Sequence, residues 1–443
     1  MIWGELHSFL LVFLSGLIAL MLNIHYIEVM IFLTFCIPFS MIMLYKTSVY
    51  LEDLIFCMND MNGMLIFMTL SLALLIFLSS WAITSMLYSF LQLALLFILL
   101  LCFSLNNLFM FYIFFESSLV PILLMIIGWG YQPERLQAGL YMIMYTVMGS
   151  MFLFVIIMYM YHYTNTLNMF FLFNFSCFSA TIFWVGIIAF LVKLPMWSLH
   201  VWLPKAHVEA PLGGSMILAG ALLKLGGYGL YMFSAFMNTS ITGTVPVTVI
   251  TLAMWGGLIS ALLCLGQSDI KAMIAYSSIV HMALVIMGCL SGTSWGQLCA
   301  LTTMVAHGWA SSALFCVAFM SYEKVNSRSF ILTKGLLKLY PILSMLWFML
   351  VLINMAVPPT INLVGELLAV PVCMWINPFI LFVLLLIMFL SVTYNMYLYV
   401  EINHGSAGSF LLSGQSTTAV GSLALLGHMF PLMLILNMNF LVG

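Results

Sequence analysis

Six ionisable side chains stand inside long apolar stretches of the sequence, where a charge is costly to bury. They are Glu116, Lys193, Lys224, His281, His307 and Glu366. An acid or a lysine at the centre of a membrane helix costs about 2.5–3.5 kcal/mol on insertion scales, so such residues are usually kept for a function. Burial favours a neutral lysine and a nearby carboxylate favours a charged one, while histidine titrates near neutrality. This set of residues therefore predicts proton transfer through an apolar layer.

Most of these residues also have a simpler interpretation, which the sequence leaves open. Glu116 is followed by two serines that could satisfy its carboxyl group, and Lys193 could extend along its apolar stem to a membrane surface. Lys224 is too central for that, and Gly220 one turn earlier would leave room for a partner or water. The two histidines could be packing residues. A further polar cluster that could equally form a solvated loop comprises His200, Lys205, His207 and Glu209.

The composition indicates what kind of element must position these side chains. Of the 443 residues, 65% are hydrophobic and 5% are charged, and the mean hydropathy is +1.22. A soluble domain carries about 25% charged residues. Long unbroken apolar runs disfavour a β-barrel, which shows alternating hydrophobicity. The predicted fold class is an all-α polytopic membrane protein, and a net charge of −2 offers no basic patch for nucleic acid.

Cofactor chemistry within this chain is not expected. The nine cysteines are scattered and form no C-x-x-C pair, so no zinc or iron–sulfur site is predicted. No Gly-rich nucleotide-binding loop follows the dinucleotide or P-loop pattern. The sequence therefore predicts no redox centre and no bound metal or cofactor in this chain.

About fourteen membrane spans of about 20 residues each are predicted from the apolar runs. They begin near Phe9, Val29, Met64, Met86, Leu108, Ala138, Thr181, Leu212, Val247, Ala272, Gln297, Pro341, Phe379 and Gly421. Loops after odd-numbered spans hold Arg135, Lys205, Lys271, Lys324, Arg328, Lys334 and Lys338, whereas loops after even-numbered spans hold only Lys46. The positive-inside rule then places both termini on the opposite side from these basic loops. The N-terminus lacks the features of a signal or transit peptide, so we expect the first span to be retained.

Two of the predicted spans are long and contain proline together with a charged residue. One carries Lys193 and Pro195, and the other carries Pro358-Pro359 and Glu366. Proline removes a backbone donor and clashes with the preceding turn, so both helices should break within the membrane. They are spans seven and twelve, which suggests two inverted five-span repeats with an ion site at each break. A simple kink or a tilted helix is the alternative.

Several motifs around these residues resemble the antiporter-like, proton-translocating subunit family of mitochondrial NADH:ubiquinone oxidoreductase (respiratory complex I), and within it chain 4. The main motif runs from Leu191 to Gly229 and includes the segment KLPMWSLHVWLPKAHVEAP. Supporting segments are FESSLVP at 115–121, DIKAMIAYSSIVHM at 269–282, AHG at 306–308 and PPTINLVGE at 358–366. The resemblance covers roughly residues 116–366.

The resemblance implies a role for each of the six residues. Glu116 would pair with Lys193, Lys224 would be the central relay with His281 and His307 as connectors, and Glu366 would be the terminal proton site. An acid at the last position is similar to chain 4 rather than to its subunit 5 relative. The implied organisation is four N-terminal helices in 1–107, one antiporter-like half in 108–246, a second in 247–400, and a C-terminal helix in 401–443.

The resemblance also implies partners and a location. NADH, FMN, iron–sulfur clusters and ubiquinone would be bound by other subunits, and redox chemistry there would drive proton transfer here. Neighbouring antiporter-like subunits would cover both flanks, within a lipid bilayer that has cardiolipin as a candidate component. The location would be the mitochondrial inner membrane, with both termini on the intermembrane-space side; the 38 methionines fit mitochondrial encoding. The alternatives are a cation/proton antiporter that works without redox subunits, and a passive structural bundle of spans.

Overall fold

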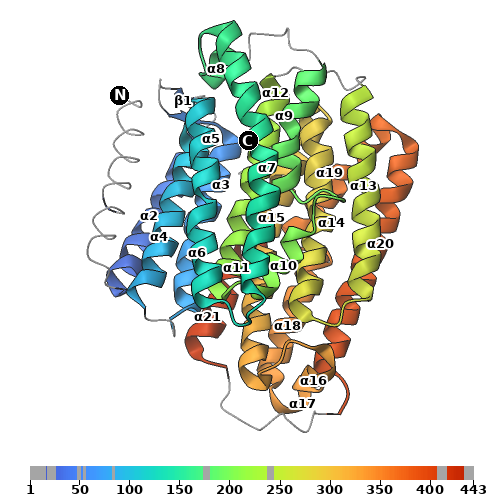
Figure 1. Ribbon diagram of the computed structural model, residues 1–443. Coiled ribbons are helices and arrows are strands. Elements are labelled where there is room, and N and C mark those ends of the chain that lie inside the picture. Colours follow the sequence, from blue (N-terminus) through green and yellow to red (C-terminus); the bar gives the residue numbers. More distant parts are fainter. Residues whose placement is uncertain are drawn as a thin grey trace.

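The chain folds into a bundle of long helices, here described from a computed structural model (Figure 1). The structure describes residues 16, 26–46, 51–52, 56–81, 85–172, 180–236, 244–406 and 417–433. The N-terminal part contains α2 (Tyr26–Lys46), β1 (Leu51–Glu52), β2 (Cys57–Met58), α3 (Asp60–Ser79), α4 (Met86–Ser104), α5 (Leu108–Ser117), α6 (Leu119–Trp129), α7 (Arg135–Thr164) and α8 (Met169–Leu172). The two short strands pair antiparallel.

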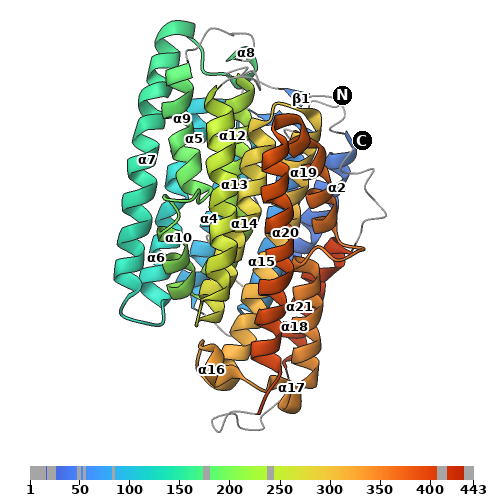
Figure 2. The same cartoon turned by 90° about the vertical axis from the view of Figure 1, so that its right-hand side faces the viewer.

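The remaining elements form the centre and the C-terminal side of the bundle. They are α9 (Ala180–Lys193), α10 (Trp202–Glu209), α11 (Leu212–Ile217), the π-helical turn η1 (Leu218–Leu222), α12 (Leu223–Phe236), α13 (Thr244–Leu265), α14 (Ile270–Leu290), α15 (Ser294–Val325), α16 (Phe330–Thr333), α17 (Leu336–Leu339), α18 (Pro341–Asn354), α19 (Ile361–Ile376), α20 (Pro378–Asn403) and α21 (Ala419–Leu432). Figures 1 and 2 show α8 at one end of the bundle and α16 and α17 at the other.

The predicted fold class of helical membrane protein is confirmed. Among the described residues, nine helices are long and apolar enough to cross a membrane, or ten if the bent pair of Phe330–Leu339 and Pro341–Asn354 forms one span. Helices, some of them interrupted, lie at the predicted spans that fall within the described residues. The predicted first span, near Phe9, lies outside them. The count of fourteen spans and the inverted repeats stay predictions.

Polar residues at the helix ends explain why the apolar runs divide where they do. Asn59 and Asn62 form a capping box at the start of α3, and the Thr293 hydroxyl accepts a hydrogen bond from the Gly296 N–H at the start of α15. The Asn377 side chain accepts a hydrogen bond from the Phe379 N–H at the start of α20. These side chains satisfy backbone groups that the first helical turn leaves without partners.

Both predicted helix breaks are confirmed. The helix α9 ends at Lys193 and α10 begins at Trp202, so the chain is non-helical around Pro195. The helix α18 ends at Asn354 and α19 begins at Ile361, so the second break contains Pro358-Pro359. Each break includes a non-glycine residue with a left-handed backbone, Ser198 with φ 79° and Ala356 with φ 58°, a conformation that costs energy and tends to mark functional sites. The predicted position at mid-membrane depth stays a prediction.

The most deeply buried helices lie at the centre of the bundle. In α14, in α15 and in the segment from α11 to α12, 94% of the apolar window is buried, compared with 39% in α7 and α20. Because α7 and α20 expose most of their surface, they form the outer faces seen in Figure 2. Lys224, His281 and His307 all belong to the central helices, and all three side chains are buried.

Candidate functional site

Lys224 is held at the centre of the molecule by an irregular helical turn. In η1 the Leu223 N–H donates to the Leu218 carbonyl, five residues back, rather than to Ala219 four residues back. The Ala219 carbonyl instead accepts a hydrogen bond from Lys224 Nζ at 2.6 Å. Such π-helical turns are rare and are often found at functional sites. Lys224 has no exposed surface, so this carbonyl is one of the few polar groups that can stabilise its amine.

His307 on α15 is the second partner of Lys224. Its Nδ1 lies 2.8 Å from Lys224 Nζ, although 83 residues separate the two in sequence. Two glycines allow this approach: a Cβ on Gly220 would lie 3.6 Å from the Gly308 carbonyl, and one on Gly308 would lie 3.2 Å from the Gly220 carbonyl. From its position one turn before Lys224, Gly220 was expected to leave space beside the lysine. Its role in the structure is close packing, since its Cβ would lie 2.6 Å from Leu72 Cδ1.

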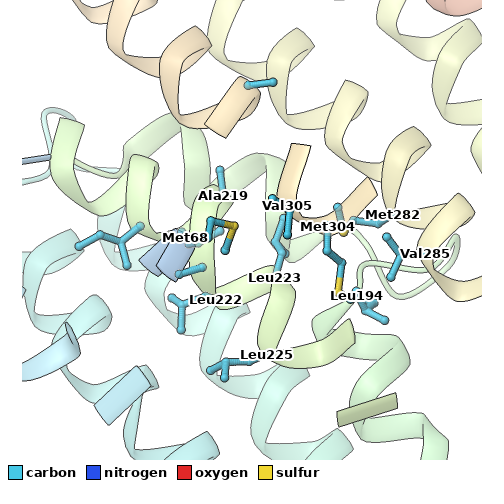
Figure 3. Packing of buried hydrophobic residues seen from close by; sticks show 14 of the residues in the cluster. Met68, Leu194, Ala219, Leu222, Leu223, Leu225, Met282, Val285, Met304 and Val305 are labelled. Atoms are coloured by element: carbon cyan, nitrogen blue, oxygen red, sulfur yellow. The ribbon is translucent and has the colours of Figure 1, made fainter. Parts of the chain in front are cut away.

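Apolar side chains pack around the helical segment that carries Lys224, and both Lys224 and His307 are buried. Figure 3 shows Leu222, Leu223 and Leu225, the sequence neighbours of Lys224, packed among methionine, valine and leucine side chains from other elements. Those labelled are Met68, Leu194, Met282, Val285, Met304 and Val305. In such surroundings an isolated charge is strongly disfavoured. The pair can therefore accept a proton only when a neighbouring group or water delivers it along a defined path.

Two further histidines approach the pair from different sides. The rings of His281 and His307 have centroids 5.5 Å apart, and His281 Nε2 is buried without a hydrogen-bond partner. His207 on α10 is fully buried and stacks on Phe315, with ring centroids 4.6 Å apart and an angle of 8° between the planes. Neither nitrogen of His207 has a hydrogen-bond partner, yet the ring interacts electrostatically with Lys224.

The structure decides against a solvated loop for the polar cluster that follows the first break. His207 and Glu209 are buried, and His200 stacks on Trp197 with ring centroids 4.5 Å apart. Lys205 lies with its Nζ 3.6 Å from the centroid of the Tyr141 ring. The sequence indicated His207 only as part of this polar cluster and not as a neighbour of Lys224. Its position between a proline break and the next buried helix could have indicated that it is buried.

A cavity of about 250 Å³ opens near this cluster, at the end of the bundle that carries α16 and α17, here called the basic-end cavity. Its lining residues are Tyr131, Gln132, Val208, Ile270, Lys271, Ala318, Phe319, Tyr322, Asn326, Ser327 and Arg328. Lys271 Nζ donates to the Ala210 carbonyl at 3.1 Å and interacts electrostatically with His207. A polar cavity of this volume can hold several waters.

The arginine at the basic-end cavity is paired with carboxylates. Arg328 forms ion pairs with Glu209 at 3.1 Å and with Asp269 at 3.3 Å, and it donates to Gln132 Oε1 at 2.9 Å. Burial raises the pKa of Tyr131 to about 12, so its phenol stays neutral in the physiological range. The carboxylate of Glu209 thus lies two residues from His207 while remaining tied to the loop arginine.

Glu116 and Lys193 lie in the same region but are not in direct contact. Lys193 Nζ donates to the Phe115 carbonyl at 2.8 Å and to Ser118 Oγ at 3.3 Å, and it lies 3.4 Å from the centroid of the Phe115 ring. Lys193 interacts electrostatically with Glu116, but the charged atoms are farther apart than an ion pair. Glu116 Oε1 is buried and has no hydrogen-bond partner. The predicted approach within about 6 Å or through water stays a prediction.

Glu366 lies on α19, one turn beyond the second break, and is separated from the other predicted residues. Its side chain is buried, and no residue in the described part of the chain forms an ion pair or hydrogen bond with it. Gly365 packs against α15, since its Cβ would lie 2.5 Å from Thr303 Cγ2. Of the six predicted residues, the structure thus joins Lys224, His307 and His281, places Glu116 near Lys193, and leaves Glu366 apart.

A polytopic helical protein whose interrupted helices flank buried lysine, histidine and carboxylate side chains has the features of an ion-translocating membrane protein. Residues 105–392 match the family model described as NADH:quinone oxidoreductase/Mrp antiporter, transmembrane. The chain belongs to this family.

Relatives and solved structures agree with this assignment. The chain is 43% identical to NADH-ubiquinone oxidoreductase chain 4 of Albinaria caerulea, over 92% of this chain and 94% of that one. It is 44% identical to the protein of the same name from Ceratitis capitata, over 79% and 78% of the two chains. In fold it is similar to a chain of respiratory complex I from Thermus thermophilus, with a TM-score of 0.88, 21% identity and coverage of 96% and 95%. A chain of the Mrp complex from Dietzia sp. gives a TM-score of 0.85, 16% identity and coverage of 100% and 96%.

Proposed function

We propose that this chain is a proton-translocating membrane-arm subunit of respiratory complex I. The observation that carries the proposal is the buried contact between Lys224 and His307. A lysine and a histidine 2.8 Å apart, both buried, can share one proton but cannot both be charged without a large electrostatic cost. Such a pair passes a proton on when the charge nearby changes.

Proton uptake is assigned to the basic-end cavity. From there His207 is the next titratable group toward the centre, because it interacts electrostatically with both Lys271 at the cavity and Lys224 in the core. Its unpartnered ring nitrogens can bind water on either side. The order of transfer is then the cavity, His207, the pair of Lys224 and His307, His281 and finally Glu366.

The change of charge near Lys224 and His307 comes from the pair of Glu116 and Lys193. The Phe115 carbonyl and ring and the Ser118 hydroxyl hold Lys193 in the resting arrangement. The backbone of α12 passes close by, since a Cβ on Gly226 would lie 3.3 Å from Lys193 Cβ. A shift of Glu116 toward or away from Lys193 would therefore alter the potential at Lys224, which is two residues from Gly226. In a low-dielectric interior such changes act over several ångströms.

Energy for the step comes from outside this chain. Moving one elementary charge against a membrane potential costs about 2.3 kcal/mol per 100 mV. We assign the redox reaction that supplies it, with NADH, FMN, iron–sulfur clusters and ubiquinone, to partner subunits. Neighbouring antiporter-like subunits would cover the flanks formed by outer helices, and lipid, including cardiolipin, the rest.

The same proposal gives the chain a location and an orientation. It would be a multi-pass protein of the mitochondrial inner membrane, with the end that carries Arg135, Lys271, Arg328, Lys334 and Lys338 facing the matrix. Both termini would face the intermembrane space. The two halves, 108–246 and 247–400, would be the functional repeats, each with one of the helix breaks.

The test is proton transport by the purified assembly that contains this chain, sealed into lipid vesicles. Addition of NADH and a ubiquinone analogue should acidify the vesicle interior, and removal of Na⁺ should leave the rate unchanged. His307→Gln should slow proton pumping and the NADH oxidation coupled to it, while the subunit content stays the same. Na⁺-dependent proton exchange without NADH would favour the antiporter alternative, and unchanged pumping in His307→Gln would overturn the proposal.

A further inference from the structure

A pair of buried amide side chains lies beside His281. Asn354 is the last residue of α18, directly before the second break, and Asn395 lies on α20. Asn354 Nδ2 donates to Asn395 Oδ1 at 2.9 Å, and both side chains are buried. A hydrogen bond between two side chains is uncommon in a protein core, and a buried polar network is costly unless its members are satisfied. We call this pair the amide bridge.

The amide bridge is held in place from both sides. The Asn362 amide, at the start of α19, donates to the Ile353 carbonyl at 2.8 Å and so ties the two arms of the break together beside Asn354. Asn395 Nδ2 donates to the Ser391 carbonyl at 2.9 Å on its own helix. Because Asn354 Nδ2 is occupied by Asn395, its oxygen is the atom left to accept a hydrogen bond. Asn354 also interacts with the side chain of His281, so this oxygen is available to the imidazole.

Two residues next to the amide bridge have buried polar atoms without hydrogen-bond partners. One is His281 Nε2, and the other is the hydroxyl of Tyr394, the residue before Asn395 on α20. Tyr394 is 1% exposed and interacts electrostatically with Glu366. Buried polar atoms of this kind normally bind ordered water. The amide bridge thus interacts with His281 through Asn354, and the phenol next to Asn395 interacts with the Glu366 carboxylate.

We propose that Tyr394 transfers protons between His281 and Glu366, and that Asn354 and Asn395 are positioning residues for this step. This inference rests on the proposed function and extends it to residues on α18 and α20. In the transfer, a water molecule takes a proton from the His281 imidazolium and gives one of its own to the phenol oxygen. The phenol gives its proton to the Glu366 carboxylate. Histidine ends neutral, Glu366 ends protonated, and water and Tyr394 recover their starting forms.

The amides themselves keep their protonation state throughout. An amide exchanges protons too weakly to act as a relay, but it fixes the orientation of the groups that do. Asn354 would hold the His281 ring with one nitrogen toward Tyr394, and Asn395 would hold Asn354. Glu366 needs such a link because no residue in the described part of the chain contacts its carboxylate by a hydrogen bond or an ion pair.

The experiment compares proton pumping and NADH oxidation by the assembled complex in vesicles for two substitutions. Tyr394→Phe removes only the hydroxyl, and Asn354→Leu removes the amide at similar volume. Each should slow proton pumping, and the NADH oxidation coupled to it, by about 10-fold or more, as expected when a transferring or positioning group of a proton path is lost. Proton transfer should then limit the rate, so the solvent deuterium isotope effect on pumping should increase, which a merely structural role would not cause.

Matched controls separate this inference from the proposed function. Tyr88→Phe removes a phenol that is buried to the same extent but accepts a hydrogen bond from the Gly213 N–H on the other side of the molecule. Asn403→Leu removes a buried amide near the end of α20. Both should pump normally. Normal pumping and isotope effects in Tyr394→Phe and Asn354→Leu, with Lys224→Met inactive, would overturn the inference and leave the proposed function standing. Normal pumping in all three would overturn both.

Discussion

Replacing Lys224 with methionine tests the centre of the site most directly. The substitution removes the amine while keeping a flexible apolar chain of similar length. The variant loses two hydrogen bonds, to the Ala219 carbonyl and to His307 Nδ1, each worth about 1 kcal/mol net. The carbonyl left without that donor costs about 1–3 kcal/mol more. Against this, burial of a lysine costs about 2.5–3.5 kcal/mol on insertion scales. The net effect on folding should be within about 2 kcal/mol of zero.

The effect on proton transport should be much larger. A positioned acid or base contributes about 10²–10⁴-fold to a proton transfer, and methionine can neither accept nor donate a proton. Pumping, and the NADH oxidation that is tightly coupled to it, should therefore fall by about 100-fold or more. Lys338 is exposed, unlike the buried Lys224, and serves as the control. Its neutralisation should leave the rates of pumping and of NADH oxidation unchanged.

The assay is acidification and NADH oxidation by the reconstituted variant complex, with subunit content measured on the same samples. Loss of pumping together with loss of assembly would show a structural role for Lys224, contrary to the near-zero stability change derived above. Full pumping by an intact Lys224→Met complex would make Lys224 a packing residue and refute the reasoning about the site.

Two further substitutions test the packing and the uptake route. Gly308→Val should reduce the amount of assembled protein, because its Cβ would lie 2.4 Å from Met68 Sδ and 3.2 Å from the Gly220 carbonyl, and overpacking costs about 1–3 kcal/mol. Gly128→Val, where nothing lies within 4 Å of the added Cβ, should assemble normally, and equal subunit content in the two variants would contradict the packing argument. His207→Phe should retain the stack on Phe315 and normal assembly but slow pumping by about 10-fold or more, since it removes both ring nitrogens. The exposed His404→Phe is its control, and equal pumping rates would exclude His207 from the path.

The amino-acid sequence by itself determined the helical membrane fold and the two helix breaks. It also identified the ionisable residues whose burial in an apolar layer costs free energy. Apolar runs of about 20 residues have only one stable arrangement in lipid, because a helix satisfies its own backbone hydrogen bonds. Pro195 and Pro359 remove backbone donors wherever the helix is placed, so the positions of the breaks follow from local chemistry. Lys193, Lys224 and Glu366 were identifiable because a charge in an apolar run is expensive in any fold.

Only the tertiary structure decided which of these residues meet. The contact of Lys224 with His307 depends on the close approach of Gly220 and Gly308 and on a π-helical turn, and neither follows from hydrophobic periodicity. His207 could have lain in a loop until packing placed it against Phe315. The bond between Asn354 and Asn395 joins helices that are 41 residues apart in sequence. Hydrophobic periodicity specifies which face of a helix is buried but not which neighbouring helix covers that face. Many apolar surfaces are energetically equivalent partners, so the packing of the whole bundle decides between them.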